Sequence, residues 1–255
     1  MPASRVRTLA IAASTLGSLF VTQQAHASAP GAVVPAAGHP ALWGIDTTDN
    51  VQTSGDITQT EADLGTPQFV GRYLVYSSRL STTEAAYIHG LGMSILLIDD
   101  PNHVFTSGGV DAQDAIAHAR ALGVPHGIAI FRDVETNDPI TSTYIAAYVA
   151  AFSGSGYIAG FYENAINGPF DSAYCGAVAS NKAIANKTLL YSSEPEHTGS
   201  NPRRSARPHF GPNVPACANR TAAWQYLERG LFPAGTWPNV DVDELAGRFS
   251  AFLWS

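Results

Sequence analysis

Apolar residues recur along the chain in short, nearly continuous runs that alternate with amphipathic stretches. Runs such as 94–98 and 127–131 contain hardly any polar side chains, which is typical of parallel strands covered on both faces. Eight runs qualify as strands, at residues 42–46, 69–74, 95–99, 127–133, 157–162, 188–191, 222–226 and 240–243. Helical patterns lie between them, at residues 58–64, 82–91, 111–122, 141–152 and 171–181.

Strands that alternate with helices over 255 residues predict an α/β fold in one domain, a single (β/α)8 TIM-type barrel. A doubly wound open sheet is the alternative. The last third leaves room for irregularity, because residues 194–219 hold too many helix breakers for an ordinary connection. We expect this segment to be a surface loop near the barrel mouth, either solvated or lining a groove edge.

The first residues have the pattern of a secretory signal peptide. Arg5 and Arg7 precede an apolar stretch at 9–21, and Ala25-His26-Ala27 offers a cleavage site. We therefore expect a signal peptide at 1–27, a flexible leader at 28–40 and a barrel domain at 41–255. The alternative is a mobile apolar N-terminus. No run reaches 18 apolar residues, so a secreted or cell-envelope protein without a membrane anchor is expected.

The charge balance narrows the class of binding partner, and the cysteine count limits the possible disulfides. The 14 basic and 21 acidic residues give a net charge of -7 with no basic stripe, which argues against nucleic acid and favours a neutral or cationic partner. We expect a monomer. Cys175 and Cys217 are the only cysteines, so export leaves one possible disulfide, the alternative being two buried thiols.

Motifs for other chemistries are missing from the sequence. It contains no His-Glu-x-x-His, no Cys-x-x-Cys, no phosphate loop and no Gly-x-Ser-x-Gly nucleophile turn. We expect no cofactor and no metal, with Ca²⁺ or Mg²⁺ in an acidic mouth as a minor alternative.

Acidic residues mark several strand ends, where TIM barrels carry their chemistry. Alternation puts Asp133 and Glu135 on one side of the fourth strand. Closure makes the first and eighth strands neighbours, so we expect Asp46 and Asp241 to face the mouth together. Crowded carboxyl groups raise one another's pKa, which creates a proton donor beside ionised partners, as glycoside hydrolysis requires.

These strand ends resemble a known family. Trp43-Gly44-Ile45-Asp46, Asp133-Val134-Glu135, Ala223-Trp224-Gln225-Tyr226 and Asn239-Val240-Asp241-Val242-Asp243 resemble, in order, strand ends of the glycoside hydrolase family 25 lysozymes. Segments 44–47, 71–73, 160–162 and 190–192 resemble the secreted glycoside-hydrolase-like barrels of the domain-of-unknown-function 1906 family. The likeness covers about residues 42–245. Two departures are Asp243, where the lysozymes have Asn, and a sixth strand without their Trp.

The resemblance implies a lysozyme-like glycosidase acting on peptidoglycan-like or related β-linked glycans. Glu135 would protonate the glycosidic oxygen, while Asp133 stays ionised and attacks, stabilises the charged centre or orients an N-acetyl group. Asp46 and Asp241 would tune both and hold hydroxyls. The residues expected to contact sugars are Tyr73, Tyr162, Trp224 and Tyr226, although aromatic residues in strands are as often core.

Asp243 and Glu244 follow the acidic strand end at Asp241. We expect these two residues to form a solvated terminal turn and to have no role in the site. The alternative function is a barrel that binds glycan in envelope maintenance without turning it over.

Overall fold

The computed structural model describes residues 40–75 and 79–255 and shows a closed barrel of eight strands in sequence order. The predicted signal peptide, and all of the predicted leader except Pro40, lie outside the described residues. The α/β barrel is confirmed, and it holds the site at one end. No helix of the described ranges is long and apolar enough to cross a membrane.

All eight predicted strands and all five predicted helices are present, with boundaries shifted by a few residues. The strands are β1 (Leu42–Asp46), β2 (Phe69–Tyr73), β3 (Ser94–Asp99), β4 (Ala129–Asp133), β5 (Ile158–Glu163), β6 (Thr188–Ser192), β7 (Thr221–Leu227) and β8 (Asp241–Leu245). The helices are α1 (Val51–Ser54), α2 (Asp56–Asp63), α3 (Thr82–Gly90), α4 (Gly108–Ala121), α5 (Ser142–Phe152), α6 (Phe170–Ser180) and α7 (Ala183–Lys187). The short helices α1 and α7 were not predicted, since four or five residues carry too little periodicity.

The strands separate two apolar layers. Side chains such as Phe69, Phe131 and Tyr191 fill the barrel interior, and the alternate positions pack outwards against the helices. The interior is crowded enough to require glycine at Gly71, where a Cβ would lie 2.4 Å from the Cβ of Asp46. Gly71 therefore keeps room for the carboxyl group of Asp46 on the neighbouring strand.

The eighth strand runs against its neighbours. Strands β1 to β7 pair in parallel, whereas β8 pairs antiparallel with both β7 and β1. The mouth, where β1 to β7 end, therefore receives the start of β8 rather than its end. Asp241 pairs with Asp46 there as expected, but it does so as the first residue of an antiparallel strand.

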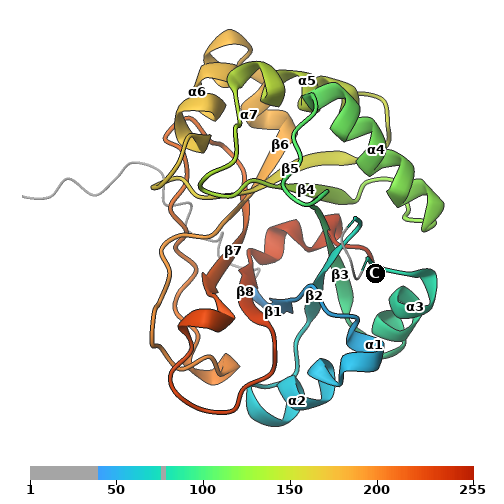
Figure 1. The fold of residues 1–255 in the computed structure, drawn as a ribbon, viewed down its shortest axis with the longest axis vertical. Coiled ribbons are helices and arrows are strands. Elements are labelled where there is room, and N and C mark those ends of the chain that lie inside the picture. The colour runs from blue at the N-terminus through green and yellow to red at the C-terminus, as the bar shows by residue number, and fades with distance from the viewer. Residues whose placement is uncertain (1–39, 76–78) are drawn as a thin grey trace, which may run out of the picture.

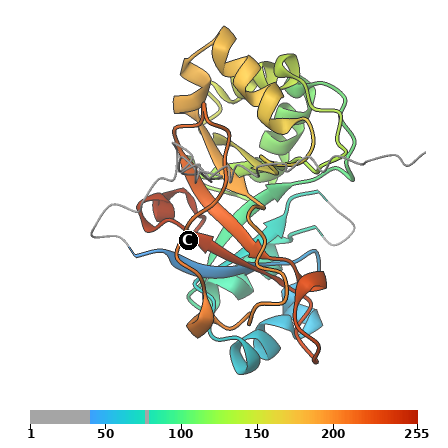
Figure 2. The ribbon, with the colours of Figure 1, turned by 90° about the vertical axis from the view of Figure 1, so that its left-hand side faces the viewer.

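The outer face of β7 and β8 is covered by a loop instead of a helix. Residues 193–220 pass over this face, shown in orange in Figure 1 and facing the viewer in Figure 2. Phe210 packs on Trp224 at 6.4 Å between ring centroids, and Arg207 forms an ion pair with Glu244 at 3.3 Å. The expected surface loop is thus a packed cover of the barrel wall.

Two further contacts close the molecule. Cys175 of α6 is bonded to Cys217, with 5.6 Å between their Cα atoms, which confirms the predicted disulfide and ties the covering loop to a helix. At the end opposite the mouth, the 3-10 helix Gly247–Phe252 places Phe249 against the barrel interior. Trp254 then pairs with Ile95 at the start of β3.

Candidate functional site

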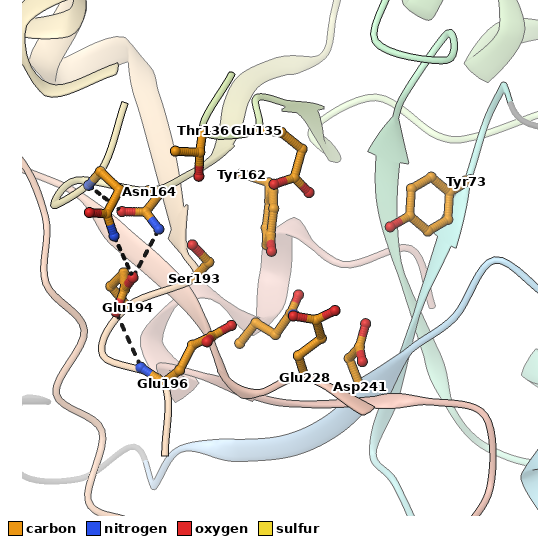
Figure 3. Close-up of a pocket in the computed structure, with 12 residues that line it drawn as sticks. Tyr73, Glu135, Thr136, Tyr162, Asn164, Ser193, Glu194, Glu196, Glu228 and Asp241 are labelled. Atoms are coloured by element: carbon orange, nitrogen blue, oxygen red, sulfur yellow. Dashed lines mark hydrogen bonds between the residues drawn. The ribbon is translucent and has the colours of Figure 1, made fainter. Parts of the chain in front are cut away.

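The mouth of the barrel holds a cavity of about 340 Å³ lined almost entirely by polar side chains (Figure 3). Glu135 lies on one side of it, just after β4, and Asp241 lies across from it at the start of β8. Tyr73 and Tyr162, from the ends of β2 and β5, complete the walls. An adjoining cavity of about 390 Å³ shares Tyr73 and Asp241 and includes Asp46. The size of the cavities and their convergent polar groups make the mouth a candidate ligand site.

Glu135 is the predicted acid that reaches the cavity. Its backbone N–H donates to Oδ2 of Asp138 at 2.7 Å, which holds the turn after β4. Burial raises the pKa of Glu135, and nearby His103 partly offsets that increase. A carboxyl group with a raised pKa that is open to the cavity has the properties of a proton donor.

Asp133 lies deeper than Glu135 on the same side of β4. Its side chain is 4% exposed and its Oδ1 has no hydrogen-bond partner among the described residues. Burial, and then repulsion from Glu135, raise its pKa well above the ordinary range. The role of Asp133 as an ionised group stays a prediction, and this environment works against it, because burial without a donor at Oδ1 disfavours the charged form.

Asp46 and Asp243 meet beneath the mouth through Tyr191. The Tyr191 hydroxyl lies 2.9 Å from Oδ2 of Asp46 and 2.6 Å from Oδ1 of Asp243. Burial raises the pKa of Asp46 well above the ordinary range and that of Asp243 to about 8. The hydroxyl can donate its proton to only one of these oxygens at a time. At least one carboxyl group of the pair therefore keeps its own proton at neutral pH.

The expected solvated turn at Asp243 and Glu244 is wrong. Both residues belong to β8 and are buried, Asp243 completely. Asp243 faces the interior below Asp46, while Glu244 faces outwards to Arg207. β8 is hydrogen-bonded to β1 on one side and to β7 on the other, so Asp243 and Glu244 lie within a paired strand and not in a turn.

Asp241 is held by a backbone donor. The N–H of Arg229 donates to its Oδ1. Burial and the charge of Asp46 nevertheless raise the pKa of Asp241 well above the ordinary range.

Three glutamates of the cavity were not predicted from the sequence. Glu194, Glu196 and Glu228 come from the connections that follow β6 and β7. Asn164 and Asn167 donate to Oε1 of Glu194 at 2.9 and 3.4 Å (Figure 3). Their position immediately after strand ends was the available signal.

The four predicted sugar-contacting aromatic residues divide into two pairs. Tyr73 and Tyr162 line the cavity. Trp224 and Tyr226 lie in the outer layer, where the Tyr226 hydroxyl accepts from Nε1 of Trp43 at 2.9 Å. The alternation of β7 turns Gln225 towards the cavity instead.

Comparison with known proteins assigns the family. A sequence model described as the Rv2525c-like, glycoside hydrolase-like domain matches residues 66–239. The chain belongs to this family. A search of curated proteins finds no match.

Three solved structures are similar to this glycoside-hydrolase-like domain. An uncharacterised protein of B. stearothermophilus is 30% identical with a TM-score of 0.77, over 84% of this chain and 100% of that chain. The Tat-secreted protein Rv2525c of Mycobacterium tuberculosis, in complex with L-tartrate, is 15% identical with a TM-score of 0.53, over 84% of this chain and 99% of that chain. A family GH25 lysozyme from Aspergillus fumigatus is 10% identical with a TM-score of 0.47, over 80% of this chain and 93% of that chain, a distance at which the likeness carries no functional information.

Proposed function

We propose that this glycoside-hydrolase-like domain is a secreted glycosidase that acts on cell-wall or related β-linked glycans. The observation that carries the proposal is the placement of Glu135 and Asp241 on opposite sides of one polar cavity. The family assignment supports a glycan-related role. The motif resemblance to the 1906 family and to family 25 lysozymes supports the same substrate class.

Export is part of this proposal. The disulfide between Cys175 and Cys217 is compatible with an extracellular protein. The predicted signal peptide at 1–27 supports export through the general secretory route.

The chemistry follows from the positions of the carboxyl groups. Glu135 donates its proton to the glycosidic oxygen as the bond from that oxygen to the anomeric carbon breaks. Positive charge then develops on the sugar ring and lowers the pKa of Asp241, which burial and Asp46 raise in the free protein. Asp241 releases its proton to water, and its carboxylate stabilises the positive charge from the far side. The deprotonated Glu135 takes a proton from water when water attacks the anomeric carbon, which restores the acid.

The test is Glu135→Gln, which keeps the shape of the side chain but cannot deliver a proton. General acid catalysis typically contributes roughly a hundredfold to ten-thousandfold in rate, so release of reducing ends from purified cell wall should fall by that factor. Glu61→Gln on α2 is the matched control, and its rate should stay at the wild-type level. Glu135→Gln should keep the wild-type melting temperature, and activity that survives in it would remove Glu135 from the acid role.

Binding without turnover is the second candidate, and one observation favours it. Asp133 is buried beside Glu135 with a raised pKa, so it is not an anion ready to assist bond cleavage. Retained glycan binding by a wild-type protein that releases no product from a broad glycan panel would establish this alternative.

A further inference from the structure

We propose that the cavity selects glycans whose sugars carry a free, protonated amino group rather than an acetamido group. The inference rests on the proposed function only in taking this cavity as the glycan site. It concerns which sugars bind, whether or not they are cleaved.

The first observation is uncompensated negative charge. The lining carboxyl groups belong to Glu135, Glu194, Glu196, Glu228 and Asp241. No lysine, arginine or histidine is among the lining residues of the described chain. A neutral sugar leaves these carboxylates facing one another, whereas an ammonium group pairs with them.

Glu228 is the centre of this charge. It is among the groups that repel Glu196, Glu135 and Asp241 and raise the pKa of each. The side chains of Glu196, Glu228 and Asp241 lie together along one side of the cavity in Figure 3. A cation bound beside Glu228 is therefore within electrostatic reach of three further carboxyl groups.

Two basic side chains lie near the cavity: Arg229, which lines only the adjoining cavity, and His103. Only the backbone N–H of Arg229 serves Asp241, while its guanidinium lies 5.4 Å from the Phe232 ring centroid. His103 lies 3.4 Å from Asp138 and 3.8 Å from Asp100. Of the cavity glutamates, His103 acts on Glu135 alone, and neither side chain forms an ion pair with Glu194, Glu196 or Glu228 in the described ranges. The positive charge beside Glu228 is therefore left for the ligand to supply.

The second observation is an unused amide. Gln225 lines the cavity and is only 5% exposed, yet its side chain makes no hydrogen bond within residues 40–75 and 79–255. A buried amide without partners is costly, and a ligand with hydroxyl groups supplies both donors and acceptors. Gln225 thus points to a hydroxylated ligand, and the carboxylates point to a cationic one. An amino sugar with a free amine has both properties.

The experiment compares three tetrasaccharides of the same β-1,4 linkage by calorimetry with the full protein, at about pH 6 and low salt. They carry an amine (chitosan tetramer), an acetamido group (chitin tetramer) or a hydroxyl group (cellotetraose) at the same ring position. We expect the amine form to bind at least about tenfold more tightly than either neutral form. About 0.5 M salt should remove most of that advantage, because the attraction is ionic.

Single substitutions test which residues cause the preference for the amine form. Glu228→Gln and Glu196→Gln should each lower affinity for the amine form several-fold more than affinity for cellotetraose, and Glu61→Gln should alter neither. Gln225→Leu should weaken all three ligands alike, since it removes hydroxyl contacts. Equal or tighter binding of the acetylated form, or no binding of any form, would overturn the inference.

Two results separate this inference from the proposed function. If the protein prefers the amine form but cleaves no glycan, the inference is supported and the proposed glycosidase function is refuted. If the protein cleaves glycan but shows no preference for the amine form, the inference is refuted and the proposed function stands. Tight binding of Ca²⁺ that displaces the amine form from Glu228 would show that the carboxylates serve a metal ion, and would also overturn the inference.

Discussion

Carboxyl groups at the rim of the cavity and carboxyl groups on its floor share one chemistry but occupy different environments. The rim consists of Glu135, Glu196, Glu228 and Asp241, which line the cavity. The floor consists of Asp46, Asp133 and Asp243, which are 4% exposed or less. The rim groups line the main cavity. On the floor, Asp46 and Asp243 share the hydroxyl of Tyr191, and Asp133 Oδ1 has no partner among the described residues.

The difference teaches that depth in the barrel decides the role of each acid. On the floor, burial is the first cause of every raised pKa, so those groups hold protons and act as neutral hydrogen-bonding partners. On the rim, burial is also the first cause of the raised pKa values, followed by neighbouring charge, but these groups line the cavity, so the protonation of Glu135 and Glu196 responds to whatever binds. The floor is therefore tested through stability and the rim through ligands and activity.

The largest effect expected from the floor is a loss of stability as the pH rises. The pKa of Asp243 is about 8 in the folded protein and near 4 in an unfolded chain. Between these values only the folded state keeps the proton, so stability is complete below about pH 4 and falls towards about pH 8. The fall is at most roughly 1.4 kcal/mol per pH unit for each such group, which lowers the melting temperature by up to about 10 °C between about pH 5 and about pH 8.

Thermal unfolding in buffers of matched ionic strength measures this slope. Asp99 and Glu244, each with a pKa raised to about 7, contribute with the same sign. A melting temperature that rises over this range would contradict the protonated floor.

Removal of the shared hydroxyl should have the next largest effect. Tyr191→Phe leaves the carboxyl groups of Asp46 and Asp243 without their common partner, which should lower the free energy of unfolding by about 1–3 kcal/mol. Urea denaturation at about pH 6 measures the change. Tyr162→Phe is the matched control, because this tyrosine lines the cavity and its hydroxyl makes no hydrogen bond within the described chain. Equal losses for the two variants would show that the floor has no special coupling.

The smallest effect is expected from Asp243→Asn. The amide still accepts from Tyr191 and can donate to Asp46, so stability at about pH 5 should stay within about 0.5 kcal/mol of wild type. The same variant should be more stable than wild type at about pH 8 and should flatten the melting-temperature slope. An unchanged slope would exclude Asp243 as a holder of the proton.

Local sequence patterns were sufficient for the elements and for part of the site. The near-continuous apolar run before Asp99 required a strand buried on both faces, and the period-two alternation placed Asp133 and Glu135 on one side. Gly71 and Asp46 are neighbours for a reason that no local pattern shows, since their contact joins two strands. Glu196 and Glu228 lie in connections, where no periodicity indicates a direction.

The sequence by itself determined the eight strands, the five longer helices, the sole possible disulfide and the shared side of Asp133 and Glu135, because each depends on spacing along the chain or on counting. The tertiary structure decided the direction of β8, and with it the approach of Asp241 to Asp46 from the start of a strand. It also decided that Trp224 faces a covering loop and Gln225 faces the cavity. The physical reason is that the direction of a strand, and the layer into which each of its side chains points, depend on pairing and burial between segments that are distant in the sequence. The pattern of a single segment does not contain that information.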